Sequence, residues 1–378
     1  MLGTLSIGDY KKKEYNVRIS GFYFDSKSDA ILIQNVRKLE ITQNTFNKSN
    51  RSIYVLPESK ETHANAMVEV NKNTFNDVNY CLFIDRDPKA SWMVSSDFTF
   101  EGNVANNALI TAVYANGIDG LKYINNVIFT PSDDKRRRFK KNHLRIDQES
   151  DWVIVANNNF FESGEESLYF ENSKAVNING NNFAWSGQNG IFSVISVNGN
   201  KSGLLINVTG NIFDWFSGSV ITTGKGVTGS VGLMSNTIFY ANQHSRYIGK
   251  EPLDQINHFA VENQNPNVIV RENNNYAFPE MRNFKSQSTS SFRTVQLADN
   301  AEARLFSGDG KLKINVPVSI GNTTPLVKLK NESNTTNSYA GLLNVTVKCQ
   351  GNISIYQLMV SKAAKTLNPE VKILASSG

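Results

Sequence analysis

Three acidic residues occupy the same position in three similar short segments. The segments are LFIDR (82–86), LRIDQ (144–148) and LYFEN (168–172), and their fourth residues are Asp85, Asp147 and Glu171. If such segments are strands stacked about 4.8 Å apart, Asp147 lies beside Glu171 and two strands away from Asp85. Glycoside hydrolysis needs two carboxylates, roughly 5 Å apart for retention or about 6.5–9.5 Å apart for inversion. The three residues are therefore candidate catalytic residues.

Neighbouring side chains suit the binding of a sugar. Tyr169 and Phe83 could stack on sugar rings, and Arg145 could hold an acidic or hydroxyl-rich substrate. The predicted substrate-binding residues are Arg145, Tyr169, Phe83, His143 and Glu149. The alternative interpretation is that exposed strands carry charges for solubility. No Cys or His spacing predicts a metal site, and no cofactor is expected.

The acidic segments belong to a longer series that predicts stacked strands. First and third residues are mostly apolar, so they should face inward, and the second and fourth residues should face outward. The series is ILIQN (31–35), IYVLP (53–57), LFIDR (82–86), ITAVY (110–114), LRIDQ (144–148), LYFEN (168–172), FSVIS (192–196), VITTG (220–224) and FAVEN (259–263).

A second repeated phrase, of which DWVIVANNNFFES (151–163) is an example, predicts a turn in every repeat. Apolar residues stand five and three positions before an Asn, and an aromatic residue follows it two or three positions later. The polar position is predicted at Asn44, Asn73, Asp97, Asn126, Asn158, Asn181, Asn211, Asn236 and Asn273. The aromatic position is predicted at Phe46, Phe75, Phe100, Phe129, Phe160, Phe183, Phe213, Phe239 and Tyr276, after a first copy that ends at Phe24 and lacks the Asn. We expect a ladder of Asn side chains in tight turns and an internal column of stacked rings.

Successive aromatic positions are 22 to 37 residues apart, which indicates a solenoid with a constant core and variable loops. Alternation at period two before each Asn favours strands over helices. Propeller blades would need longer repeats, and the frame of leucine-rich repeats is absent. The sequence therefore predicts an all-β protein with a right-handed parallel β-helix of about ten coils over residues 1–278.

The last hundred residues have a different rhythm. Segments such as KLKINVPVSI and GLLNVTVKC alternate polar and apolar residues and are separated by Gly, Asn or Pro. They predict antiparallel strands of a small sandwich-like domain over residues 279–378, for trimerisation or glycan binding.

Composition narrows the class of protein. A net charge of +5 over 378 residues does not by itself indicate a nucleic-acid partner. The basic run DDKRRRFKK (133–141) suits a solvated loop, or a basic rim that attracts an anionic polysaccharide. No apolar stretch approaches the length of a membrane span and no signal peptide is visible, so membrane insertion is not expected.

An Asn-rich β-helix followed by a β-strand domain resembles the bacteriophage tailspikes of the pectate-lyase-like superfamily. The resemblance implies a homotrimer on the virion tail that binds and cleaves capsule or O-antigen polysaccharide at the bacterial surface. Asp147 and Glu171 match the type and the face of the catalytic carboxylates of such proteins. Two alternatives remain, a polysaccharide lyase in which Tyr169, His143 or Arg145 assists proton abstraction, and a non-catalytic adhesin.

Overall fold

The computed structural model describes residues 3–9, 11, 13–57, 65–87, 89, 95–129, 141–200, 204–239, 261–265 and 268–276, together with six strand segments after residue 291. The chain divides into two compact units, one comprising Met1–Phe292 with Phe306–Lys311 and the other Arg293–Leu305 with Leu312–Gly378. The predicted boundary between residues 278 and 279 lies outside the described residues.

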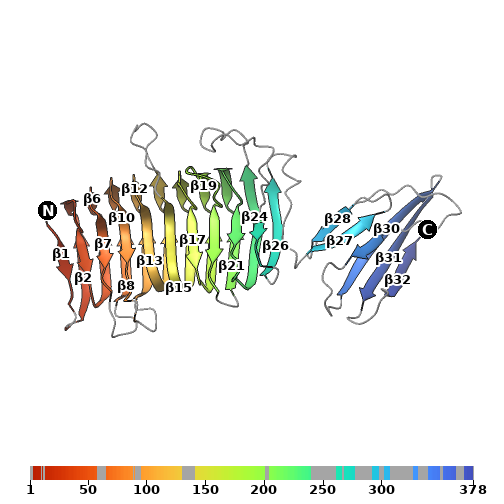
Figure 1. Cartoon of the computed structure of the whole chain (residues 1–378), viewed down its shortest axis with the longest axis horizontal. Coiled ribbons are helices and arrows are strands. Elements are labelled where there is room, and N and C mark those ends of the chain that lie inside the picture. Colours follow the sequence, from red (N-terminus) through yellow and green to blue (C-terminus); the bar gives the residue numbers. More distant parts are fainter. Residues whose placement is uncertain are drawn as a thin grey trace. The chain divides into compact units, whose positions relative to one another are not determined.

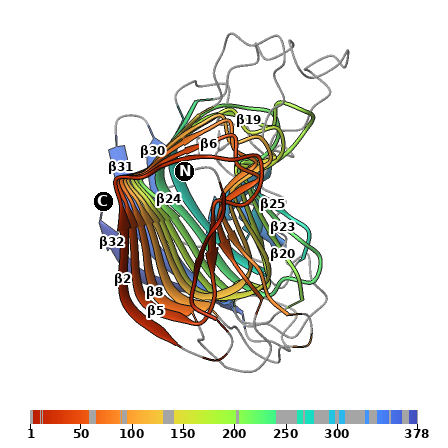
Figure 2. The ribbon, with the colours of Figure 1, turned by 90° about the vertical axis from the view of Figure 1, so that its left-hand side faces the viewer.

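The first unit is a parallel β-helix, because each strand pairs in parallel with the corresponding strands of the neighbouring coils (Figure 1). Three stacks of strands, here called stacks A, B and C, form its walls. Figure 2 shows the β-helix end-on, along its axis, with the strands of successive coils superimposed. The described residues contribute ten coils, so the predicted β-helix of about ten coils is confirmed.

Each coil runs through stack A, stack B and stack C in turn. Stack A comprises β1 (Leu5–Ile7), β4 (Ile31–Ile33), β7 (Arg51–Val55), β10 (Tyr80–Ile84), the first parts of β13 (Thr111–Ile124) and β15 (Asn142–Ala156), β17 (Leu168–Glu171), β20 (Ile195–Asn198), β23 (Ile221–Thr223) and β25 (Val261–Asn263). Stack B comprises β2 (Glu14–Ser20), β5 (Val36–Thr42), β8 (Asn65–Asn71), β11 (Ser95–Glu101), the second parts of β13 and β15, β18 (Ala175–Asn179), β21 (Leu204–Thr209), and the first parts of β24 (Gly229–Phe239) and β26 (Val268–Tyr276). Stack C comprises β3 (Tyr23–Asp25), β6 (Thr45–Asn47), β9 (Thr74–Asn76), β12 (Val104–Asn106), β14 (Val127–Phe129), β16 (Asn159–Phe161), β19 (Asn182–Ser186), β22 (Ile212–Phe216) and the ends of β24 and β26.

A ladder of buried Asn side chains links the turns between stacks B and C. Each ladder Asn after the first accepts, on Oδ1, the backbone N–H and the side-chain N–H of the ladder Asn one coil earlier, as Asn158 does from Asn126 at 2.9 Å for both. From Asn44 to Asn236, the Nδ2 of each ladder Asn donates to a backbone carbonyl of the earlier coil, as Asn158 does to Tyr123 at 2.8 Å. The ladder residues are Asn44, Asn73, Asn103, Asn126, Asn158, Asn181, Asn211, Asn236 and Asn274.

Two predicted ladder positions are wrong. The fourth copy uses Asn103 in place of Asp97, which lies in stack B, and the last copy uses Asn274 in place of Asn273. The residue before the ladder Asn has a left-handed φ in most coils, for example 55° at Asn157 and 63° at Gly180. Such a φ favours Gly or Asn and explains why these residues recur just before the ladder.

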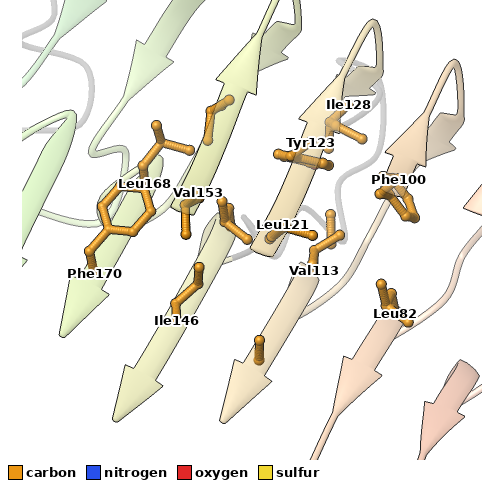
Figure 3. Packing of buried hydrophobic residues seen from close by; sticks show 14 of the residues in the cluster. Leu82, Phe100, Val113, Leu121, Tyr123, Ile128, Ile146, Val153, Leu168 and Phe170 are labelled. Carbon is orange, nitrogen blue, oxygen red and sulfur yellow. The ribbon is translucent and has the colours of Figure 1, made fainter. Parts of the chain in front are cut away.

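The column of rings inside the helix is interrupted in the middle and completed from another stack. Phe24, Phe46 and Phe75 stack with ring centroids 4.9 and 5.0 Å apart. The next two inward positions of stack C hold the smaller Ala105 and Ile128, in register with Phe75 and with Phe160. There stack B supplies the larger side chains, Phe100 and Tyr123, whose rings bridge Phe75 to Phe160. Large residues thus lie beside smaller ones, as Tyr123 lies beside Ile128 in Figure 3, and the interior stays close-packed.

This packing corrects three predicted members of the column. Phe100 belongs to stack B, and the inward residues of β14 and β24 are Ile128 and Ile238. Phe129 and Phe239 face outward instead, and the side chain of Phe239 is 38% exposed. The spacing of two or three residues allowed in the repeat was too loose to separate neighbouring positions that point to opposite faces.

The second unit contains two small sheets. One comprises β28 (Glu302–Phe306), β27 (Phe292–Leu297) and β29 (Val327–Lys330), of which β27 and β29 are antiparallel. The other is an antiparallel meander of β30 (Tyr339–Cys349), β31 (Asn352–Lys362) and β32 (Glu370–Ser377). Antiparallel strands are therefore confirmed here, while a role in trimerisation or glycan binding stays a prediction.

Candidate functional site

The register of stack A decides which outward side chains lie together. Leu82, Val113, Leu144 and Leu168 are consecutive inward partners. The next residue of each strand points outward, and this first outward column reads Tyr54, Phe83, Tyr114, Arg145 and Tyr169. The prediction put Thr111 in this column in place of Tyr114. It aligned Ile110, the first residue of ITAVY (110–114), with Leu82, whereas the structure pairs Val113 with Leu82.

The same kind of error affects the last three segments of the predicted series. The structure aligns Ile195, Ile221 and Val261 with Leu168, whereas the prediction aligned Phe192, Val220 and Phe259. The segments before Leu168 that contain the candidate carboxylates were aligned correctly. The errors therefore do not alter the predicted neighbours Asp147 and Glu171.

A second outward column, two residues further along each strand, carries the carboxylates. Asn116 is the partner of Asp147, and Glu171 is the partner of Asn198. The pair Ile146 and Phe170, continued by one residue, puts Asp147 beside Glu171. The pair Ile84 and Ala115, continued likewise, puts Asp85 beside Asn116. The column therefore reads Asp85, Asn116, Asp147, Glu171 and Asn198, with one amide between Asp85 and Asp147.

Asp147 is held by two residues of the first column. The hydroxyl of Tyr114 donates to Oδ2 of Asp147 at 3.1 Å. The Nε of Arg145 lies 2.9 Å from Oδ1 and forms an ion pair with it. The guanidinium of Arg145 also lies 4.1 Å above the ring of Tyr169. These contacts fix the orientation of the carboxylate and place a cation and an aromatic face next to it.

Asp85 has a similar environment two coils away. The hydroxyl of Tyr54 donates to Oδ2 of Asp85 at 3.1 Å, and the backbone N–H of Arg86 donates to Oδ1 at 2.8 Å. The guanidinium of Arg51 lies 3.5 Å above the Tyr54 ring. Arg51 is in turn held by both oxygens of Asp29, at 2.8 and 2.6 Å.

Aromatic rings join the two carboxylate environments. Phe83 and Tyr114 stack with centroids 4.6 Å apart, and Tyr54 meets Phe83 edge-on at 5.6 Å. Tyr80 packs edge-on against Phe83 at 4.9 Å. The result is a continuous strip of rings across β7, β10 and β13, bordered by carboxylates on one side. We call the outward residues of stack A from β7 to β17 the aromatic–acidic strip. They are Tyr54, Phe83, Tyr114, Arg145 and Tyr169 in the first column and Asp85, Asn116, Asp147 and Glu171 in the second.

Burial makes the phenols of Tyr114 and Tyr169 harder to ionise than ordinary tyrosines. It raises the pKa of Tyr114, and the nearby carboxylate of Asp147 raises it further. Burial likewise raises the pKa of Tyr169, with Glu171 adding to the effect. A protonated phenol can donate a hydrogen bond to a carboxylate or to a sugar oxygen, and it is a poor general base.

Glu166 is a further carboxyl beside the strip that the repeat pattern does not reveal, because it precedes the strand β17. Burial raises the pKa of its carboxyl, and the charge of nearby Arg145 partly opposes this effect. The Nδ2 of Asn142 donates to the Glu166 backbone carbonyl at 2.8 Å. Tyr114 was missed because its segment was aligned at Ile110, although VYAN (113–116) matches LRID (144–147) in its order of apolar and polar residues.

The structure contradicts the predicted contact between His143 and a substrate. His143 is wholly buried, its ring centroid lies 4.9 Å from that of Phe160, and its Nε2 lies 3.0 Å from the Phe161 carbonyl oxygen. Alternation fails at the start of β15, where Asn142, His143 and Leu144 are all buried. Glu149 lies past Gln148, whose φ is 65°, at the bend between stacks A and B, and its predicted role stays a prediction.

Two negative findings complete the description. Among the residues with described positions, no group of three or more His, Cys, Asp or Glu side chains could hold a metal ion. In the same part of the chain, no helix has the length and hydrophobicity needed to cross a membrane. Most of the basic run 133–141 lies outside the described residues, so its predicted place beside the site is not addressed.

Comparison with known proteins gives structural neighbours but no sequence relative. No protein-family model and no curated protein matches the chain. Among solved structures, the chain is similar to the gp42 tailspike of Acinetobacter phage vb_AbaP_AS12, with 11% sequence identity, a TM-score of 0.31, and coverage of 100% of this chain and 66% of that one. It is also similar to the tailspike protein of Acinetobacter phage vB_ApiP_P1, with 12% identity, a TM-score of 0.15, and coverage of 90% of this chain and 74% of that one. The chain thus spans slightly less than two thirds of the length of the gp42 tailspike chain.

Proposed function

We propose that the chain is a tailspike-type depolymerase, which binds a bacterial surface polysaccharide along stack A and hydrolyses it. The observation that carries the proposal is the aromatic–acidic strip, where Asp147 lies one coil from Glu171 beside Arg145 and Tyr169. Aromatic faces suit sugar rings, and hydrogen-bonding groups beside them suit sugar hydroxyls. The polysaccharide would be capsule or O-antigen, and the protein would act as a homotrimer on the virion tail.

The spacing of the two neighbouring coils that carry Asp147 and Glu171 favours hydrolysis with retention of configuration. Neighbouring coils are about 4.8 Å apart, close to the roughly 5 Å that retaining enzymes use. In this mechanism Glu171 donates a proton to the leaving oxygen while a carboxylate oxygen of Asp147 bonds to the anomeric carbon. Glu171 then removes a proton from water, whose oxygen displaces Asp147 from the sugar. Tyr114 and Arg145 hold Asp147 in place through both steps.

The test is the cleavage of a panel of purified capsular polysaccharides and O-antigens by the wild type and two variants. Asp147→Asn and Glu171→Gln are expected to lower the rate of chain shortening by about 100-fold or more, because each removes a group that acts directly on the reacting bond. Chain length is followed by size-exclusion chromatography, and circular dichroism checks the fold. Glu69→Gln on the outer face of stack B is the matched control and should keep full activity. Full activity in both stack A variants would refute this choice of site.

The two alternatives predict different products. A lyase acting on a uronate-containing chain would release an unsaturated product that absorbs ultraviolet light, whereas hydrolysis creates only new reducing ends. The raised pKa of Tyr169 disfavours its use as the base of a lyase. An adhesin would bind the polysaccharide tightly without shortening it.

A further inference from the structure

The aromatic–acidic strip contains the same hydrogen-bonded pair twice. Tyr54 donates to Asp85, and Tyr114 donates to Asp147, each at 3.1 Å and each to a carboxylate on the next coil. The two tyrosines are in register through Phe83, and the two aspartates share a column through Asn116. The copies are two coils apart, which is roughly 10 Å along the helix axis.

The two copies differ in the residue that follows the aspartate in its column. Beside Asp147 lies the carboxylate of Glu171, which can donate or accept a proton. On the side of Asp85 that faces Asp147, the neighbour is the amide of Asn116, which cannot act as a general acid. The copy at Asp85 therefore has the polar groups that could bind a sugar, but it lacks the second carboxylate that hydrolysis requires.

The surroundings of Asp85 are built as a fixed platform. Arg51 is held by both oxygens of Asp29 and covers one face of Tyr54 at 3.5 Å. The Tyr54 ring packs against Phe83, which stacks on Tyr114 of the other copy. Side chains held in this way lose little freedom when a ligand binds, so a sugar placed there gains affinity at a low entropic cost.

We propose that Tyr54 and Asp85, with Phe83 beside them, form a second sugar-binding subsite that holds the same glycan chain as the Asp147 site. The proposal rests on the proposed function of stack A and extends it, because it makes Asp85 a binding residue and directs the glycan along the helix axis. From β7 to β17 the strip spans four steps between coils, or roughly 19 Å. The ligand is thus a hydroxyl-rich oligosaccharide long enough to contact both the Tyr54–Asp85 pair and the Tyr114–Asp147 pair. A shorter oligosaccharide contacts only one of the two pairs.

The experiment separates binding from catalysis by kinetics on the polysaccharide that the wild type cleaves in the panel. Asp85→Asn is expected to raise KM about tenfold with little change in kcat, because it weakens hydrogen bonds made by a charged group outside the reacting bond. Tyr54→Phe removes only the hydroxyl and should shift KM in the same direction, which guards against misfolding of the first variant. Glu69→Gln should change neither constant. A loss of kcat in Asp85→Asn as large as that in Asp147→Asn, or no change in either constant, would overturn the proposal.

A binding experiment keeps this inference distinct from the proposed hydrolysis. The probe is a set of oligosaccharides of graded length, prepared by partial acid hydrolysis of the polysaccharide that the protein binds, titrated calorimetrically into the Glu171→Gln protein. Adding Asp85→Asn should weaken the binding of long oligosaccharides about tenfold and leave short ones unchanged. If the wild type binds but does not shorten the chain, hydrolysis is refuted while this length dependence still supports the subsite. Equal weakening at every length would refute the subsite alone, and failure to bind any polysaccharide would refute both.

Discussion

Replacing the ladder residue Asn158 by Ala tests the physical basis of the fold. Its side chain accepts two hydrogen bonds from Asn126 and donates one to the carbonyl of Tyr123 and one to Oδ1 of Asn181, all at 2.8–2.9 Å. The side chain is buried, so water does not replace these partners. The substitution therefore removes four hydrogen bonds and leaves the backbone N–H of Asn126 unsatisfied.

The size of the effect follows from these contacts. A buried neutral hydrogen bond contributes about 1 kcal/mol net, and an unsatisfied buried donor costs about 1–3 kcal/mol. Because the bonds share atoms and part of the loss relaxes, we expect the free energy of unfolding to fall by about 3–5 kcal/mol. Asn182→Ala, one coil away and exposed, should cost at most about 0.5 kcal/mol, because the one hydrogen bond described for its side chain, to the half-buried Asn159, lies at the surface.

Urea unfolding followed by circular dichroism measures both variants under the same conditions, and hydrogen exchange supplies a local readout. The amide of Asn126 should lose protection in Asn158→Ala, because its acceptor is gone, and should keep it in Asn182→Ala. A loss of less than about 1 kcal/mol, or an unchanged exchange rate at Asn126, would refute the claim that the side-chain ladder stabilises these turns.

Two further predictions concern the core and the acid–base behaviour of the fold. Phe160→Ala should lower the free energy of unfolding by about 3–5 kcal/mol, because the ring is fully buried in the column, whereas Phe161→Ala, whose side chain is 38% exposed, should cost at most about 1 kcal/mol. Thermal unfolding of the two variants checks this, and equal losses would contradict the assignment of faces in β16. The raised pKa of Glu166 means that the folded state holds its proton to higher pH than the unfolded state, so stability should fall as pH rises through and above 4.5. Glu166→Gln should lack this fall, so its Tm relative to that of the wild type should rise across the same range, and a difference that does not change with pH would count against the partly buried position of the carboxyl.

Much of the architecture could be predicted from the sequence because the repeat reflects the physics of stacking. Every coil must place apolar residues inside and a turn residue at the same height, so Asn and Phe recur at a nearly constant distance. The predicted ring column was wrong where the interior can be filled by large side chains from either of two stacks. Large rings at Phe100 and Tyr123 replace the stack C ring in the coils of Ala105 and Ile128, and no pattern within one repeat reveals that exchange.

The site was predicted in part for a similar reason. The segments with Asp85, Asp147 and Glu171 share apolar first and third residues, so their register could be read directly. Tyr114 could not be placed, because LITAV (109–113), which is apolar except for Thr111, fits the alternation in more than one register. The burial of His143 and the proximity of Glu166 to Arg145 depend on how the chain bends before the strands, which alternation does not determine.

The ladder also bears on how such a protein can change. Consecutive ladder residues are separated by as few as 23 residues, between Asn103 and Asn126, and by as many as 38, between Asn236 and Asn274. Their hydrogen bonds are nevertheless of the same kind. Segments between coils can therefore lengthen or be exchanged without altering the partners of the Asn side chains or the register of stack A. In a scaffold of this kind the loops can vary while the stacked strands stay the same. A foreign loop grafted between two coils would therefore leave the spacing of the neighbouring coils unchanged.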